Sequence, residues 1–210
     1  ALINYLALVG WSYDDHTTFM TVPELVERFS LERVNTSPGV FDAEKLEWLN
    51  GEHLRALSPG EFAATLQAYL ETSGSALAGQ PERVAQVAPI VQEKLRTLGQ
   101  FEGFAGFLFG PAPLDAAAWA RVEGDPDSAR WLAAAHAALA DIPAWEADAI
   151  HAALAAACER EGVKPRALYT PIRVAITGRT VAPGLYESLE LLGREESLRR
   201  IEDALGRLAA

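Results

Sequence analysis

Residues 173–193 read RVAITGRTVAPGLYESLELLG, in which two apolar runs are separated by the loop GRTVAPG at residues 178–184. Because glycine often follows a helix and proline often begins one, this stretch predicts a helix, a loop and a second helix. No acidic residue occurs from Gly162 to Tyr186, although the chain as a whole carries a formal net charge of −11. The charged side chains around this loop are therefore all basic, although the chain as a whole is acidic.

Helix signals of the same kind recur before this stretch. Thr21, Asp42 and Ser58 are predicted N-caps, because their side chains can accept a hydrogen bond from the first helical turn. We expect the Asn50-Gly51 pair to interrupt or bend the helix that Asp42 begins. The residues expected to face inward from the first two of these helices are Leu25, Val26, Phe29, Leu46, Leu49 and Trp48.

The remaining segments are also predicted to be helices. The predicted ranges are 2–9, 81–109 in two pieces with Pro89 at a start or a kink, 115–122, 128–139, 144–160, 172–177, 184–192 and 194–208. Residues 35–39, 74–81 and 110–115 are expected to be loops or linkers. No segment shows the alternation of apolar and polar residues that is typical of strands. The predicted fold class is therefore all-α, a bundle of short helices.

Composition excludes several classes of function. Half of the 210 residues are hydrophobic, so a packed core is expected, and the negative net charge argues against a protein that coats nucleic acid nonspecifically. The single cysteine, Cys158, fits a buried helix face and a reducing cytoplasm. No apolar run reaches the roughly 20 residues that span a bilayer. The four histidines are scattered, and no glycine-rich phosphate loop is present, so we expect no metal site and no catalytic residue.

The basic stretch admits two interpretations. Cations near helix C-termini complement the helix dipole, and this alone can explain Lys164, Arg166, Arg173 and Arg179. Alternatively, the stretch faces RNA. Free backbone N–H groups where Pro183 begins a helix can bind a phosphate, and the Thr180 hydroxyl can donate and accept hydrogen bonds. Val181, Pro183 and Leu185 are then expected to form an apolar surface for an unstacked base.

Four motifs carry a resemblance to a known family. They are ALINYLALVGWS at 1–12, SPGVFDAEKLEWLNGEHLRAL at 37–57, VQEKLRTL at 91–98 and PIRVAITGRTVAPGLYESLELLGREESLRRIEDAL at 171–205. In this order they resemble the C-terminal half of bacterial glutamyl-tRNA synthetase, a class I aminoacyl-tRNA synthetase. The resemblance is weakest across Gly110–Gly162. It implies a ligase of protein biosynthesis that activates glutamate with ATP and Mg and attaches it to tRNA(Glu).

The resemblance also implies which residues contact tRNA. In that family an arginine approaches the third anticodon base, and the matching residue here is Lys94, with Arg96 where lysine is common. Lysine is a point charge without the two parallel donors of arginine, so the sequence leaves open whether tRNA(Gln) is charged as well. The expected anticodon-binding residues are Lys94, Arg96, Arg173, Arg179, Thr180, Ala182, Pro183 and Leu185. The expected stem contacts are Lys45, Asn50 and Arg55, while Trp48 is expected in the core.

Both signature motifs of the catalytic domain are absent from these 210 residues, so the chain alone is expected to be inactive and to bind no cofactor. Three domains are expected: a part of the stem-contact domain at 1–58 and two helical anticodon-binding subdomains at 59–106 and 107–210. We expect a monomer in the cytoplasm. An alternative function is a helical scaffold that docks a protein partner, such as a tRNA-dependent amidotransferase, through Trp119, Trp131 and Trp145. Buried tryptophans are the simpler interpretation of that segment.

Overall fold

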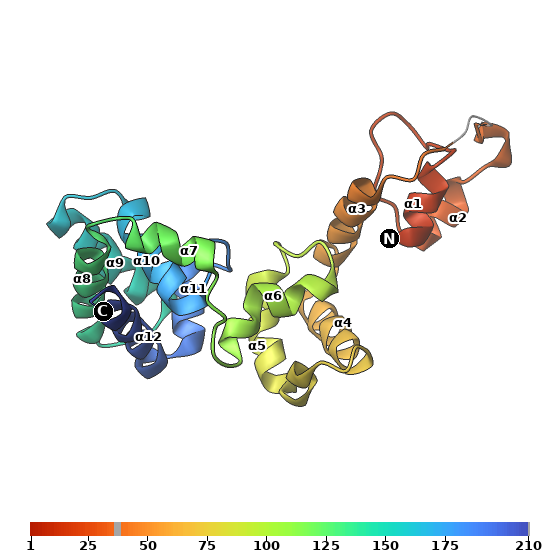
Figure 1. Cartoon of the computed structure of the whole chain (residues 1–210). Coiled ribbons are helices and arrows are strands. Elements are labelled where there is room, and N and C mark those ends of the chain that lie inside the picture. The colour runs from red at the N-terminus through yellow and green to blue at the C-terminus, as the bar shows by residue number, and fades with distance from the viewer. Residues whose placement is uncertain (36–38, 210) are drawn as a thin grey trace. The chain divides into compact units, whose positions relative to one another are not determined.

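The computed structural model describes residues 1–35 and 39–209, and within these residues all regular structure is helical (Figure 1). The predicted all-α fold class is therefore confirmed. The α-helices are α1 Leu2–Leu8, α2 Val22–Arg28, α3 Ala43–Arg55, α4 Pro59–Thr72, α5 Pro81–Val91, α6 Phe101–Ala105, α7 Ala116–Glu123, α8 Ser128–Ala140, α9 Ala147–Glu161, α10 Pro165–Thr177, α11 Leu185–Leu192 and α12 Arg194–Leu208. Short 3-10 turns lie at Leu31–Arg33, Ala76–Gly79, Leu98–Gln100 and Gly106–Leu108.

The described chain groups into two compact units, Ala1–Phe101 and Glu102–Ala210. We call them unit 1 and unit 2. The expected division into three domains stays a prediction. Part of the expected loop at 35–39, namely residues 36–38, lies outside the described residues. No helix in the described ranges is long and apolar enough to cross a membrane.

The helices of unit 1 begin where local capping predicts. Thr21 and Ser58 each accept from the backbone N–H three residues later and form complete capping boxes with Glu24 and Glu61. Asp42 caps α3 through the backbone N–H of Lys45 at 3.0 Å. These caps satisfy backbone donors that an isolated helix end leaves unpaired.

Several predictions about inward faces in unit 1 are wrong. Leu49 is fully buried, but Val26 is 78% exposed and Trp48 is 40% exposed. Phe29 is also exposed in part, although its ring packs against Trp11 at 5.4 Å between centroids. Neighbouring residues of a helix point about 100° apart, so a face that buries Leu49 turns Trp48 outward.

Neither the Asn50-Gly51 pair nor Pro89 ends a helix, while the expected bend or kink at these residues stays a prediction. α3 runs unbroken through Asn50 and the buried Gly51 to Arg55. α5 passes through Pro89 and ends soon afterwards at Val91, so residues 92–97 are not helical. A proline removes the backbone hydrogen bond to the residue four positions earlier, and α5 ends two residues after Pro89.

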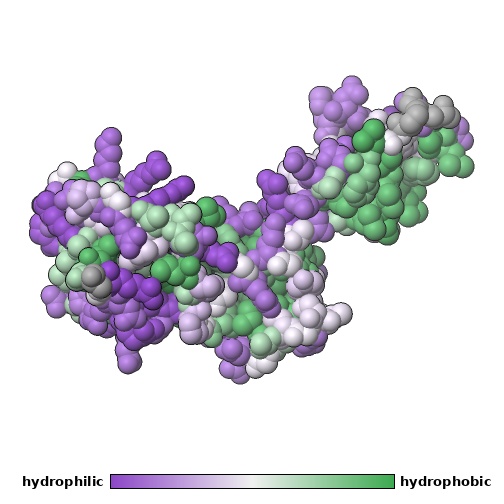
Figure 2. Space-filling model, in the orientation of Figure 1, coloured by the Kyte–Doolittle hydropathy of each residue, from purple (hydrophilic) through white to green (hydrophobic). Residues whose placement is uncertain are grey.

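Unit 1 also exposes a large apolar surface in its N-terminal part, which Figure 2 shows as a face of hydrophobic colour. Its members on α1 and the segment after it are Leu2, Ile3, Leu6 and Val9, and Val40 and Phe41 add to it before α3. A contiguous apolar surface of this kind is typical of a region that packs against another protein surface.

Unit 2 is organised around α8, which packs against α9, α10 and α12. The core includes Leu132, Leu139, Ile150, Leu154, Leu168, Ile172, Leu189 and Ile201, all fully buried. Cys158 is buried among them, as the sequence predicts. α10 is longer than predicted, because Pro165 occupies its first turn and Lys164 is its N-cap residue.

Candidate nucleic-acid interface

The loop after α10 begins at a glycine that no other residue replaces easily. Gly178 ends α10 in the left-handed conformation, with φ +73°. A Cβ on Gly178 would overlap the carbonyl oxygen of Pro113, and the backbone N–H of Asp115 donates to the Gly178 oxygen at 2.9 Å. The loop therefore starts from a point held tightly against the 110–115 segment.

Arg173 holds the far end of this loop. Its guanidinium is half-buried and donates to the carbonyl oxygens of Pro183 at 2.8 Å and Ala182 at 3.4 Å. Burial lowers the pKa of Arg173, and the nearby Tyr186 and Glu187 act in the opposite direction. Arg173 therefore fixes the position of Ala182 and Pro183, and a direct contact with RNA remains a prediction.

Thr177 and Arg179 hold the first part of the loop. The Thr177 hydroxyl lies 2.8 Å from the Arg173 carbonyl oxygen and accepts from the Arg179 N–H at 3.1 Å. The exposed Arg179 side chain donates to the Gly103 carbonyl oxygen at 2.6 Å. This bond leaves the remaining guanidinium N–H groups of Arg179 available to another ligand. Sequence reasoning did not identify Thr177, whose position one residue before the glycine is the only local signal.

The predicted apolar surface for a base is wrong for two of its three residues. Pro183 is buried, and Leu185 is 4% exposed within the core of unit 2. Val181 is 73% exposed, while Thr180 and Ala182 are half-buried. The helix periodicity of α11 turns Leu185 toward the core, so Val181 is the apolar side chain that the loop presents to solvent.

The start of α11 also differs from the prediction of an open phosphate site. The carboxylate of Glu187 lies against Gly184, where it would overlap an added Cβ. A carboxylate at this position complements the positive end of the helix dipole. An anion can bind at the α11 N-terminus only after Glu187 moves.

In unit 1, the predicted residues lie along α3 and in the segment after α5. Lys94 and Arg96 are exposed, and they lie in turns after α5 rather than on one helix. The Asn50 amide donates to the Arg96 carbonyl oxygen at 2.6 Å, and the Arg96 N–H donates to the Gln100 side chain at 2.9 Å. Asn50 thus joins α3 to the segment that carries both cations.

Gly51 explains why the Asn-Gly pair sits inside a helix. A Cβ on Gly51 would lie 3.4 Å from the Cα of Arg96, which shows how closely the two backbones approach.

Arg55, one turn later, is half-buried and pairs with Glu52 at 2.6 Å, so its charge is already compensated. Lys45 is exposed near the start of α3. The stem contacts assigned to Lys45, Asn50 and Arg55 remain predictions.

Comparison with known proteins identifies the family. A model of the anticodon binding domain matches residues 61–205, more than half of the chain. The chain belongs to the anticodon-binding domain family.

Similar curated proteins agree with the resemblance seen in the motifs. The glutamate–tRNA ligase of Saccharopolyspora erythraea is 45% identical over 98% of this chain and 42% of its own length. That of Mycobacterium tuberculosis is 44% identical over 97% of this chain and 42% of its own. The chain therefore spans about two fifths of the length of these relatives.

A solved glutamate tRNA ligase from Elizabethkingia meningosepticum has the same fold, with a TM-score of 0.81 over 99% of this chain and 41% of its own. At 22% identity it is evidence for the fold alone. The resemblance to bacterial glutamyl-tRNA synthetase is confirmed by the curated relatives.

The three tryptophans of the alternative protein-docking face pack in or against the core of unit 2. Trp131 is 6% exposed in the core, and Trp119 and Trp145 are partly buried against it. The Trp145 indole N–H donates to the Leu189 carbonyl oxygen at 2.8 Å. This agrees with the expectation that these residues pack between helices.

Proposed function

We propose that this chain is the tRNA-binding part of a glutamate–tRNA ligase and that it holds the anticodon region of tRNA(Glu). The observation that carries the proposal is the match of residues 61–205 to the anticodon binding domain. Within that range, the loop at 178–184 is held at both ends and presents the exposed Val181 and Arg179. A preorganised loop with one cation and one apolar tip suits an unstacked base and its phosphate.

The rest of such a ligase would activate glutamate with ATP and Mg and transfer it to the tRNA in the cytoplasm. The apolar surface on α1 and before α3 fits packing against that remaining part. The curated relatives are named for glutamate alone, so the proposed substrate is tRNA(Glu), with tRNA(Gln) as a comparison in the test.

The test is a fluorescence-anisotropy titration of the chain with anticodon stem-loops of tRNA(Glu) and tRNA(Gln). Arg179→Gln is compared with Arg160→Gln, which removes the same charge from an exposed position at the end of α9. We expect wild type to prefer the glutamate stem-loop. Arg179→Gln should weaken its binding by roughly tenfold and reduce the salt slope by about one, while Arg160→Gln changes little.

A third set of titrations varies the third anticodon base and compares the wild-type chain with Lys94→Arg on each RNA. If Lys94 reads this base, the arginine variant gains discrimination, because two parallel donors replace a point charge. Binding that is indifferent to every anticodon change, or absent at low salt, contradicts the proposed function.

A further inference from the structure

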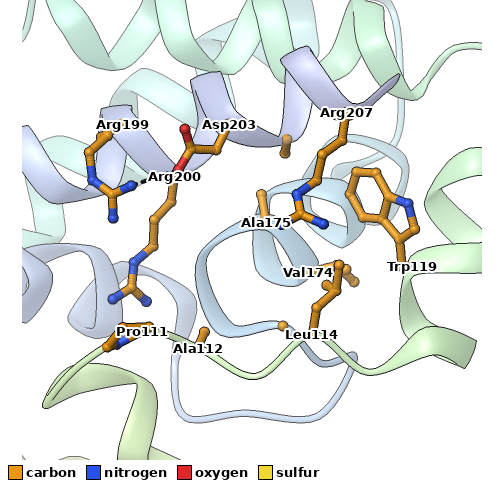
Figure 3. A pocket seen from close by; sticks show the side chains of 12 residues that line it. Pro111, Ala112, Leu114, Trp119, Val174, Ala175, Arg199, Arg200, Asp203 and Arg207 are labelled. Carbon is orange, nitrogen blue, oxygen red and sulfur yellow. Dashed lines mark hydrogen bonds and ion pairs between the residues drawn. The ribbon is translucent and has the colours of Figure 1, made fainter. Parts of the chain in front are cut away.

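Unit 2 contains a groove beside the start of the loop at 178–184. The groove has a volume of about 200 Å³ and lies between α12, the end of α10, α7 and the 111–114 segment (Figure 3). Its lining includes three arginines and one aspartate in a chain with a formal net charge of −11. This local reversal of charge is the first sign of an anionic ligand.

One arginine builds the wall of the groove. Arg200 is 7% exposed and donates to the carbonyl oxygens of Ile176 at 2.6 Å, Phe107 at 3.0 Å and Gly110 at 2.9 Å. Its Nε also donates to Glu196 at 2.6 Å. With these partners, Arg200 joins α12 to α10 and to the 106–110 segment, and these bonds use four of its five N–H donors.

The second arginine is compensated as well. Arg199 pairs with Glu196 at 2.7 Å and with Asp203 at 2.6 Å. The cluster of Arg199, Arg200, Glu196 and Asp203 therefore carries two positive and two negative charges. It shapes one side of the groove without giving it a net charge.

Arg207 is the groove arginine whose charge this cluster does not compensate. Among the described residues it has no ion pair and no hydrogen bond from its side chain, and it is exposed. Figure 3 shows its side chain reaching from α12 toward Val174 and Trp119. An arginine over an open groove can present two parallel N–H donors to a phosphate.

The part of the groove beside Arg207 is lined by apolar side chains. Trp119 of α7 and Leu114 line it together with Val174, and Trp119 remains partly exposed. An aromatic side chain of this kind provides a face on which a base can stack. Gly178 belongs both to the groove and to the start of the anticodon loop, so the two surfaces are continuous.

We propose that this groove binds one nucleotide, with its phosphate on Arg207 and its base against Trp119. The inference rests on the proposed function, because the nucleotide it favours belongs to an RNA that also occupies the loop at 178–184. The same chemistry is present in a free nucleotide, and the experiment separates the two sources.

The experiment follows the five tryptophan indole N–H signals by NMR. Trp119→Phe serves only to assign the Trp119 signal. The chain is titrated with the anticodon stem-loop of tRNA(Glu) and, separately, with AMP. We expect the stem-loop to shift the Trp119 signal and Arg207→Gln to weaken stem-loop binding about tenfold, whereas Arg160→Gln leaves it unchanged.

Each result of these titrations supports or contradicts either the nucleotide site or the proposed function. A Trp119 shift with AMP but not with RNA, lost in Arg207→Gln, keeps the nucleotide site and assigns it to a free nucleotide. RNA binding in which neither RNA nor AMP shifts the Trp119 signal, or a Trp119 shift that is equal in Arg207→Gln and Arg160→Gln, overturns the inference while the proposed function stands. Anisotropy that detects no RNA binding by wild type refutes the proposed function instead, and a Trp119 shift with AMP then still reports on the groove.

Discussion

Gly178 and Gly162 provide a matched test of what holds the loop at 178–184 in place. Both glycines end a helix of unit 2 in the left-handed conformation, with φ +73° and +68°. An added Cβ meets nothing within 4 Å at Gly162, but at Gly178 it overlaps the Pro113 carbonyl. Alanine at either position therefore costs the same conformational energy, and only Gly178→Ala adds a steric clash.

The expected magnitudes follow from this difference. The left-handed conformation costs an alanine about 1 kcal/mol, which is our expectation for Gly162→Ala. At Gly178 the backbone must also move away from Pro113, which endangers the hydrogen bond from the Asp115 N–H to the Gly178 oxygen, worth about 1 kcal/mol. With residual strain, we expect Gly178→Ala to lose about 3 kcal/mol.

The assay is urea unfolding of both variants followed by circular dichroism. Any gain from a less flexible unfolded chain is common to the two substitutions and cancels in the comparison. Fluorescence anisotropy of the tRNA(Glu) stem-loop then measures whether Gly178→Ala also weakens RNA binding by displacing the loop at 178–184. Losses of stability that agree within about 0.5 kcal/mol would refute the argument that contact with Pro113 sets the start of the loop.

Three further predictions concern the helices themselves. Trp48→Ala should lower the free energy of unfolding by about 1 kcal/mol, because more than half of its side chain is buried, whereas Leu49→Ala should cost about 2–5 kcal/mol, and equal losses in urea unfolding would contradict the orientation of α3. Hydrogen bonds from Arg199 and Arg200 lower the pKa of Glu196 to about 2 from an ordinary value of 4.5. Glu196 therefore stabilises the fold above pH 4.5, and this contribution is lost as the pH falls toward 2. Melting temperatures measured across that range should fall less steeply for Glu196→Gln, and identical slopes would speak against the pairing. Burial raises the pKa of the Cys158 thiol, so a disulfide reagent should modify it at least about tenfold more slowly in the native chain than in urea, and equal rates would show that Cys158 is accessible.

Local signals in the sequence determined where most helices begin. Thr21, Asp42 and Ser58 cap their helices because the acceptor and the backbone donor lie only three residues apart, so no distant contact is needed. The all-α class, the last two helices and the family resemblance follow from the same short-range information. The glycine, the proline and the basic residues of the loop at 178–184 are likewise visible in the sequence alone.

The tertiary structure alone decided what each of these residues does. Arg173 and Asn50 look like available polar groups in the sequence, but each bonds a carbonyl oxygen on a segment that the fold brings to it. Leu185 and Val181 are equally apolar, yet one fills the core and the other faces solvent. Composition cannot separate such residues, because burial and hydrogen-bond partners depend on helices that are distant in the chain. The groove beside Arg207 and Trp119 exists for the same reason, since it forms only where α7, α10 and α12 pack together.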